Sequence, residues 1–317
     1  MNDSSIGFIG LGNVGSKVAN NIIKKGYSLY VHDLNENLSK HLVSKGAIFC
    51  QSIDELITNV TVIITCLPTP ASVKNVILKS LPYINNKHLW IEMSTTDEEE
   101  MRSLSKLVLE KKAEVIEAPI TGGQHTAESG NISVLVGGNR DSFKRSFPIL
   151  ISIGHRILHC GEIGTASTLK VVTNYLASIN LLALGEALMV CKKYGIDLKT
   201  AYEGIKISSG NSFVHETESQ VILNGSYNVG FTMDLVLKDV SLFEKLTHKF
   251  KIPAQISKLM VNIFKQGKKI LGKKAYSTSI VKILENQCME DLRSKGFPPI
   301  IVDKENKKDG IEINKYD

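Results

Sequence analysis

The chain has 317 residues, of which 43% are hydrophobic and 22% are charged, with a formal net charge of +6. A chain of this length can bury large cores without disulfide or metal crosslinks and corresponds to about two domains. Its five cysteines are odd in number, widely spaced and free of CxxC pairs, which argues against a disulfide framework or a zinc site. No signal or transit peptide is visible before the first expected strand at about Ile6, so we expect a cytoplasmic protein.

Short β-branched runs alternate with amphipathic segments of helical length through the first half of the chain. The expected strands are IGFIG, SLYVHD, VTVIITCLP, HLWIEMS, AEVIEAP, ISVLVGG and HRILHCG. This alternation predicts parallel βαβ units in an α/β fold, a doubly wound Rossmann sheet over residues 1–164. His155 and His159 are spaced as a helical metal pair, but they fall in an expected strand, so we expect structural or surface roles and no metal.

After about Gly164 the strand patterns stop, and residues 165–292 are expected to form an all-helical substrate and oligomerisation domain. One long helix, Ser167–Cys191, would join the two domains. Its apolar run contains Asn174, Asn180 and Glu186, which favours a buried core helix over a membrane span. The polar residues 293–317 predict a surface extension.

The first expected strand leads directly into a GxGxxG pattern that opens an amphipathic helix, the context of a dinucleotide-binding loop. The first glycine permits a tight turn, the second lets the backbone approach a pyrophosphate, and the third lets helix and strand pack closely. The phosphates would lie at the helix N-terminus, where N–H groups and the helix dipole favour negative charge. We therefore expect cofactor contacts from Gly10, Leu11, Gly12, Asn13, Val14 and Gly15.

Asp33 ends the second expected strand, where an acid would bind both hydroxyls of the adenosine ribose. A carboxylate there repels the 2′-phosphate of NADP, and no arginine follows to accept one. We therefore expect NAD rather than NADP. The alternative for Asp33 is a simple turn residue.

Lys170 lies near the start of the long apolar helix, where burying an ammonium costs several kcal/mol unless it is paired or used. Burial disfavours the charged amine and should lower its pKa toward the range of an acid/base catalyst. Asn174 lies four residues later on the same helix face and can donate to a substrate oxygen or hold the lysine through its carbonyl. The alternative is a lysine that extends from the helix end to solvent.

Four separated segments resemble, in the same order, those of the β-hydroxyacid dehydrogenase family. This family includes 3-hydroxyisobutyrate dehydrogenase and the glyoxylate, succinic semialdehyde and tartronate semialdehyde reductases. The segments are GFIGLGNVG (7–15), EAPITGG (117–123), GTASTLKVVTN (164–174) and GFTMDLVLKD (230–239). The resemblance covers about residues 5–290. It implies an oxidoreductase of a small β-hydroxy acid, or of the aldehyde acid in reverse, with Lys170 as general acid/base.

The same resemblance implies further site residues. Thr121, Gly122 and Gly123 would bind the substrate carboxylate through a hydroxyl and backbone N–H groups, the alternative being an ordinary Gly-Gly turn. The family usually has Asp-Ala-Pro-Val-Ser-Gly-Gly at 117–123, so Thr121 stands where the family has serine. The added methyl group narrows the pocket, so the identity of the substrate is not determined by the resemblance. Phe231 would shield the nicotinamide ring, and Asp239 would fix Lys238. The remaining implied cofactor contacts are Leu67, Pro68 and Thr95.

Two other functions remain open: a non-catalytic NAD-binding scaffold, against which Lys170 argues, and an NADPH-dependent glyoxylate or semialdehyde reductase. Residues 245–274 contain nine lysines and no acid, a pattern of either a nucleic-acid surface or a solvated helix face. The interleaved apolar residues favour the solvated face, so we expect neither nucleic acid nor a membrane as partner. An apolar stripe in the helical domain predicts a homodimer or homotetramer.

Overall fold

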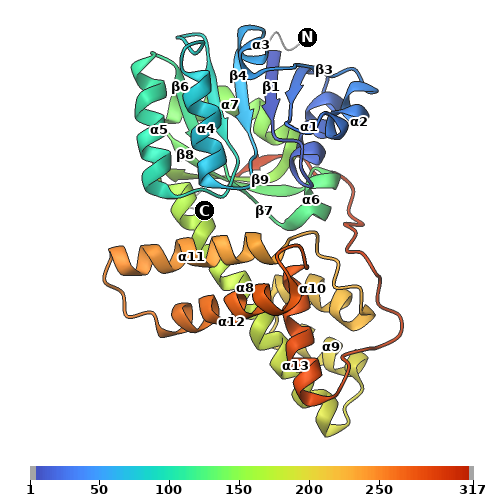
Figure 1. Cartoon of the computed structure of the whole chain (residues 1–317). Helices are drawn as coiled ribbons and strands as arrows, with labels where there is room; N and C mark the ends of the chain where they lie inside the picture. Colours follow the sequence, from blue (N-terminus) through green and yellow to red (C-terminus); the bar gives the residue numbers. More distant parts are fainter. Residues whose placement is uncertain (1–4, 314–317) are drawn as a thin grey trace. The chain divides into compact units, whose positions relative to one another are not determined.

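The structure, a computed structural model, describes residues 5–313 of the chain (Figure 1). The chain divides into two compact units, one formed by residues 1–170 with 303–317 and the other by residues 171–302. We call them the α/β unit and the helical unit. The chain therefore passes from one unit to the other twice, once within a long helix and once near its C-terminus.

This division differs from the boundaries expected after residues 164 and 292. The expected extension is split, because residues 293–302 belong to the helical unit whereas the segment from Asp303 onward returns to the α/β unit. The last residues of that extension, 314–317, lie outside the described part of the chain.

A single sheet forms the centre of the α/β unit, with strand order β10-β9-β8-β6-β5-β4-β1-β2-β3 and β7 paired to β8. All neighbouring strands from β3 to β6 run parallel, which confirms the expected Rossmann arrangement. The strands are β1 (Ser5–Ile9), β2 (Ser28–His32), β3 (Ile48–Phe49), β4 (Val62–Thr65), β5 (Leu89–Glu92), β6 (Glu114–Glu117), β7 (Ile120–Thr121), β8 (Ile132–Gly138), β9 (Gly154–Gly161) and β10 (Ile311–Glu312).

The order of the strands reverses between β1 and β4, and ligands of open α/β sheets bind beyond the carboxyl ends of the strands at such a point. The expectation of parallel pairing is wrong for β8, which runs antiparallel to both β6 and β7. Between β7 and β8 the chain passes through Gly122 and Gly123, which both have positive φ angles, and the short helix α6 (Gly123–Ser129).

Helices cover both faces of this sheet (Figure 1). One apolar core joins one face to the first group of helices and a second core joins the other face to the second group, so the central strands are buried on both sides, as parallel strands are. The first group is α1 (Gly15–Lys24), α2 (Lys40–Val43), α6 (Gly123–Ser129) and α7 (Arg140–Ile153), with the short 3-10 helix η1 (Glu36–Ser39) before α2. The second is α3 (Ile53–Thr58), α4 (Pro70–Ser80) and α5 (Glu98–Glu110).

The C-terminal segment is built into the edge of the α/β unit. Strand β10 pairs in parallel with β9, and the Arg140 guanidinium binds both carboxylate oxygens of Glu312 at 2.5 and 2.8 Å. Lys307 Nζ donates to the carbonyls of Gly130 and Ser152 at 3.2 and 2.8 Å, near the C-terminal ends of α6 and α7. Asp303 accepts from the Ser129 hydroxyl at 2.6 Å. These side-chain and backbone bonds fix a segment that has no apolar pattern.

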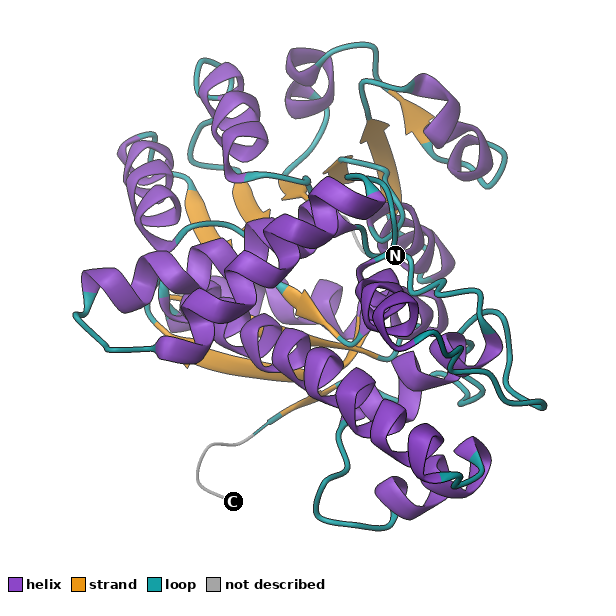
Figure 2. Ribbon diagram, turned by 60° about the horizontal axis from the view of Figure 1, so that its bottom comes forward, coloured by secondary structure: helices purple, strands orange, loops and turns teal. Residues whose placement is uncertain are grey.

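The helical unit continues from α8, and Figure 2 shows helices and loops over this part of the chain. Buried residues of several helices, among them Leu184, Leu188, Val236 and Phe264, form its core. All nine lysines between 245 and 274 are exposed. The helices are α8 (Thr165–Tyr194), α9 (Leu198–Lys206), α10 (Phe213–Asn224), α11 (Met233–Lys249), α12 (Gln255–Leu271), η2 (Ser277–Ile280) and α13 (Val281–Cys288).

Helix α8 is long and apolar enough to cross a membrane on length and composition alone. Its leucines Leu181, Leu184 and Leu188 are buried in the core of the helical unit. Of its most apolar window, 33% is buried in the structure.

Candidate active site

The glycine loop after β1 shows why two of its three glycines, Gly10 and Gly15, are needed by the fold itself. Gly10 has a φ of +100°, and a Cβ there would lie 2.3 Å from the carbonyl oxygen of Cys66. A Cβ on Gly15 would lie 2.1 Å from the carbonyl oxygen of Gly10, so only glycine lets α1 pack this closely on the loop. A Cβ on Gly12 would meet nothing within 4 Å, which leaves its backbone open to a ligand.

The N-terminus of α1 has the features of an anion site. Its N-cap residue, Val14, makes no side-chain cap, and the first turn holds no acidic residue. The first N–H groups of a helix carry partial positive charge and need an acceptor from outside the helix. The loop from Leu11 to Val14 therefore fits the pyrophosphate of a dinucleotide.

Asp33 lies directly after β2 and holds this loop. Its Oδ2 accepts the Leu11 N–H at 2.7 Å, and its Oδ1 accepts the Asn35 N–H at 2.8 Å. Both oxygens retain lone pairs for further donors. The next side chain, Leu34, is fully exposed.

Leu67, Pro68 and Thr95 follow the carboxyl ends of β4 and β5, next to β1 in the sheet. Leu67 N–H donates to the Ser94 hydroxyl at 2.8 Å, which ties the two loops together. Three of the predicted cofactor contacts thus lie on adjacent loops beside the glycine loop.

Beneath these loops lies a buried carboxylate, Glu92, that sequence reasoning missed. It accepts hydrogen bonds from the Ser94 N–H and the Thr65 hydroxyl, both at 2.5 Å. Burial raises the pKa of Glu92 to about 7, against the hydrogen bonds, which lower it. An acid that ends an apolar strand run, as in LWIE, was the signal available in the sequence.

A second buried carboxylate, Glu117, is the Cα register partner of Glu92 on the neighbouring strand β6. It accepts the N–H groups of Gly164 and Ala166, both at 2.8 Å, and the Ser167 hydroxyl. These groups form the start of α8, the helix that carries Lys170. Burial raises the pKa of Glu117.

Lys170 lies on a buried face of α8 and is 8% exposed. Ala166, Ser167 and Val171 on the same part of the helix are also buried. Asn174 follows one turn later, as expected from the spacing.

Thr121 ends β7, and Gly122 and Gly123 form the turn into α6 with φ angles of +126° and +86°. A Cβ on Gly122 would also lie 2.7 Å from the Thr126 hydroxyl, so a side chain is excluded there. This backbone is disfavoured for other residues, which explains the glycine pair and keeps the predicted anion-binding N–H groups unshielded by side chains.

In the helical unit, Asn174 Nδ2 donates to Asp239 Oδ2 at 2.5 Å, and Lys238 Nζ lies 2.8 Å from Asp239 Oδ1. Asp239 is buried at 2% exposure: its Oδ2 accepts the Asn174 amide, whereas its Oδ1 has the Lys238 ammonium at ion-pair distance but no hydrogen-bond partner among the described residues. The structure therefore brings together three of the predicted residues. Phe231 is half-buried against the same core, and its carbonyl accepts the Ser277 N–H at 2.8 Å.

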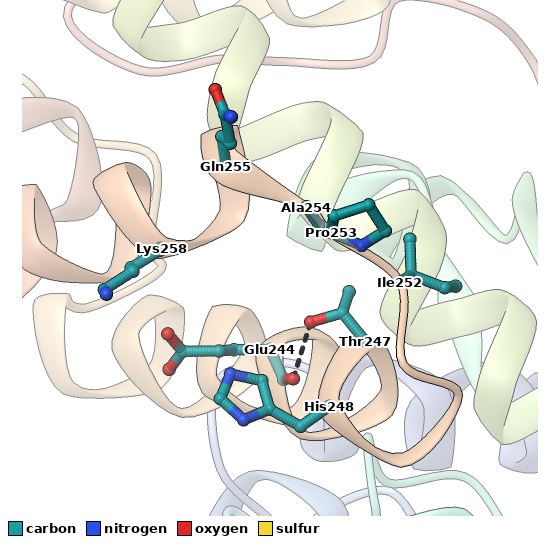
Figure 3. A pocket seen from close by; sticks show the side chains of 8 residues that line it. All are labelled: Glu244, Thr247, His248, Ile252, Pro253, Ala254, Gln255 and Lys258. Atoms are coloured by element: carbon teal, nitrogen blue, oxygen red, sulfur yellow. Dashed lines mark hydrogen bonds between the residues drawn. The ribbon is translucent and has the colours of Figure 1, made fainter.

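Other chemistry-bearing groups lie apart from these residues. His155 Nδ1 bonds the Asp309 carbonyl at 2.7 Å, and His159 Nε2 bonds the Gly138 carbonyl at 2.8 Å, so each histidine of the HRILH strand serves its own partner. Residues 5–313 contain no cluster of three or more metal-binding side chains. A pocket at the junction of α11 and α12 is lined by Glu244, His248 and Lys258, and none of the predicted site residues lines it (Figure 3).

Comparison with known proteins agrees with this geometry. Residues 5–161 match the family model of the NAD binding domain of 6-phosphogluconate dehydrogenase, and residues 164–284 match that of NAD-binding of NADP-dependent 3-hydroxyisobutyrate dehydrogenase. The chain is 31% identical over 285 residues to 2-(hydroxymethyl)glutarate dehydrogenase from Eubacterium barkeri, covering 88% of this chain and 94% of that protein. The chain belongs to the β-hydroxyacid dehydrogenase family.

Further matches support this assignment. Mitochondrial 3-hydroxyisobutyrate dehydrogenase from Mus musculus is 30% identical over 270 residues, which cover 82% of this chain and 81% of that protein. The solved 3-hydroxyisobutyrate dehydrogenase of Mycobacterium tuberculosis, at 23% identity, shares the fold with a TM-score of 0.81 over 89% of this chain and 99% of that chain. The resemblance expected from four motifs is confirmed: the protein is an NAD(P)-dependent hydroxyacid dehydrogenase.

Proposed function

We propose that this hydroxyacid dehydrogenase oxidises a small β-hydroxy acid with NAD, using Lys170 as general base, and reduces the aldehyde acid in the reverse direction with Lys170 as general acid. The observation that carries the proposal is a lysine held on a buried helix face at 8% exposure. Removing an amine from water costs free energy, and a role in exchanging a proton with a reacting oxygen explains why the protein keeps one there.

The geometry of Asp33 supports NAD as the cofactor. Its carboxylate is fixed beside the glycine loop by the N–H groups of Leu11 and Asn35. A fixed negative charge favours ribose hydroxyls as donors and repels a 2′-phosphate. When bound, NAD supplies the acceptor for the hydride that leaves the alcohol carbon. Contacts to it are proposed for the glycine loop, Leu67, Pro68, Thr95, Phe231 and Lys238.

The two curated relatives act, by their names, on 2-(hydroxymethyl)glutarate and 3-hydroxyisobutyrate, which both carry a hydroxymethyl group beside a carboxylate. We propose a substrate of this class. The carboxylate would bind the hydroxyl of Thr121 and the N–H groups of Gly122 and Gly123, which precede α6. Asn174 would orient the reacting hydroxyl, with its own amide fixed by Asp239.

Removal of the hydroxyl proton is the part of the reaction that Lys170 performs. The neutral amine accepts this proton as the carbon loses hydride, so kcat/KM for oxidation rises with pH as Lys170 deprotonates. The reverse reaction requires the ammonium form and falls over the same pH range.

Lys170→Met tests the proposal. Methionine keeps an apolar stem and suits a helix, so the variant should fold and bind NAD in calorimetric titration. With 3-hydroxyisobutyrate and a panel of related hydroxy acids, kcat should fall at least about 100-fold. Lys170→Arg should not restore activity, because guanidinium does not deprotonate near neutral pH. A folded methionine variant with near wild-type turnover would remove Lys170 from the mechanism.

We also propose a homodimer or homotetramer. The helical unit exposes Val190 at 69%, Tyr194 at 83% and Ile207 at 87%, apolar groups that a second copy would cover. A monomeric mass by light scattering at micromolar concentration would contradict this.

A further inference from the structure

We propose that Glu117 is a positioning residue for Lys170: its carboxylate fixes the first turn of α8 and so sets where the lysine amine meets the substrate. The inference rests on the proposed function, in which Lys170 is the general acid/base. Glu117 itself touches neither substrate nor cofactor in this scheme, and it acts through the helix.

The contacts of Glu117 all go to the start of one helix. Oε1 accepts the N–H groups of Gly164 and Ala166 at 2.8 Å each, and Oε2 accepts the Ser167 hydroxyl. The N-terminal N–H groups of a helix have no partner within it, so a buried helix start needs such an acceptor. Here one side chain of β6 supplies it from 47 residues earlier in the sequence.

The anchored residues lie on the Lys170 face of the helix. Ala166 precedes Lys170 by four residues and Ser167 precedes it by three, the spacings that place helical side chains one above another. All three are buried. A shift of the first turn therefore moves the lysine amine, and misplacement of a catalytic group by ~1 Å costs about 100-fold in rate.

The absence of a side chain at Gly137 leaves room for the Glu117 carboxylate. A Cβ on Gly137 of β8 would lie 2.3 Å from Glu117 Oε1, so a side chain at 137 would displace the carboxylate. Glu117 is fully buried, and no ion pair of Glu117 is formed within residues 5–313. Its carboxyl oxygens accept hydrogen bonds from N–H and hydroxyl groups at the start of α8 instead.

The charged groups named around this contact come from two elements, β5 and α5. Glu92 of β5 is the register partner of Glu117, and Arg102 of α5 lies over Gly164, where it pairs with Glu98 at 3.2 Å. Strand β8 contributes only Gly137. The negative charge of Glu117 opposes the positive end of the α8 dipole, and that positive end disfavours an ammonium at Lys170. Loss of the charge should therefore favour the neutral lysine.

Glu92 provides a matched control. It is an equally buried glutamate at the same level of the sheet, but its partners are Thr65, which ends β4, and Ser94 in the loop after β5, both next to the proposed cofactor loops. Replacement of Glu92 by glutamine should act on cofactor binding, and replacement of Glu117 should act on the proton-transfer step.

The experiment compares full-length Glu117→Gln, Gly137→Ala and Glu92→Gln, each checked for folding by circular dichroism. Glu117→Gln and Gly137→Ala should lower kcat about 10–100-fold with the KM for NAD changed less than about two-fold, and Glu117→Gln should move the rising limb of kcat/KM to lower pH. Glu117→Asp should recover part of kcat, since it restores the charge. Glu92→Gln should instead raise the KM for NAD and leave the pH at which kcat/KM rises unchanged.

Ser167→Ala, which removes one donor and leaves the carboxylate, replaces Glu117→Gln as the deciding variant if the glutamine protein does not fold. A folded Glu117 variant with unchanged kcat and pH profile would overturn the proposal. A lower kcat in Glu117→Gln, with the pH dependence of kcat/KM unchanged and kcat not restored in Glu117→Asp, would also overturn it. That result would describe a purely structural residue.

Lys170→Met separates this inference from the proposed function. In the methionine background, Glu117→Gln should cause no further loss, because residues that act as one unit are not additive. An active Lys170→Met protein contradicts the proposed function itself. An inactive Lys170→Met protein beside a normal Glu117→Gln protein contradicts only the role of Glu117.

Discussion

The two units stabilise their buried carboxylates in different ways. In the α/β unit, Glu92 and Glu117 accept hydrogen bonds from backbone N–H and hydroxyl groups. In the helical unit, Asp239 pairs with Lys238, and Glu285 pairs with Arg293 at 2.8 Å. Glu92 and Glu117 are thus held by neutral donors, whereas Asp239 and Glu285 have a cation beside their neutral donors. The buried Glu98 of the α/β unit is an exception, because it pairs with Arg102.

Backbone geometry explains the difference. The carboxyl ends of parallel strands lead into loops and helix N-termini, where N–H groups have no partner within the element and carry partial positive charge. The sides of packed helices offer no such groups, because their N–H groups bond within the helix. A carboxylate buried there relies more on side chains: Glu285 accepts one backbone N–H, from Leu292, and pairs with Arg293. Carboxylates at the sheet edge can therefore position loops and helices that bind ligands, whereas those of the helical unit mainly join helices to each other.

The largest expected effect concerns Asp33, a third carboxylate held by backbone N–H groups. Asp33→Ala should weaken NAD binding by about 2–4 kcal/mol, because two charge-assisted hydrogen bonds to the ribose are lost. It should also free the Leu11 N–H, which Asp33 accepts at 2.7 Å. Leu34→Arg keeps that anchor and should improve NADP binding. The Kd values from titration check both, and a wild type that prefers NADPH would contradict the electrostatic argument.

Arg293→Met should show how strongly the helical unit depends on its cations. The substitution leaves Glu285, 3% exposed, without its cation, although the Tyr227 hydroxyl still donates to it. Breaking a buried pair costs roughly 3–5 kcal/mol, and the partial exposure of Arg293 lowers this to about 2–4. Urea denaturation measures the change. Arg145→Met, which breaks an exposed pair with Glu114, is the control and should cost under about 1 kcal/mol. Equal losses would contradict the comparison.

Glu92 should make stability depend on pH in the opposite sense to an ion-paired acid. Its pKa is about 7 in the folded protein against 4.5 for the ordinary group. Between these values the unfolded chain has released the proton that the folded protein still binds, so stability falls as pH rises and then levels above about 7. Glu92→Gln should remove roughly 1–3 kcal/mol of this fall. Chemical denaturation at pH 5 and pH 8 tests it, and an identical slope in the variant would count against the assignment.

The smallest expected effect concerns Lys307, a cation of the α/β unit that binds backbone groups. Lys307 Nζ binds carbonyls near the ends of α6 and α7, including that of Ser152 at 2.8 Å, so in the α/β unit a cation also meets backbone groups. Lys307→Met should destabilise the protein by about 1 kcal/mol. Lys304→Met, on the same exposed segment, is the control and should be neutral in thermal denaturation. Equal melting temperatures of the two variants would show that the carbonyl contacts add nothing.

Local sequence determined much of this protein. The spacing of Gly10, Gly12 and Gly15 predicts the loop that the structure contains, because these glycines meet steric demands within a few residues of themselves and in the next strand. Short β-branched runs predicted seven of the ten described strands, and one long apolar run predicted α8, whereas the two-residue strands β3, β7 and β10 were not expected. The position of Lys170 within an apolar helix predicted that its side chain is buried, and its exposure is 8%.

Tertiary structure decided the features whose partners lie far away in the chain. Glu117 caps a helix that begins 47 residues later, and a lone acid at the end of a strand does not reveal which N–H groups it meets. The polar C-terminal segment joins β9 through bonds to groups more than 150 residues earlier. Backbone carbonyls and N–H groups are the same at every residue, so such bonds leave no pattern in the sequence, and only the folded arrangement of helix ends selects them.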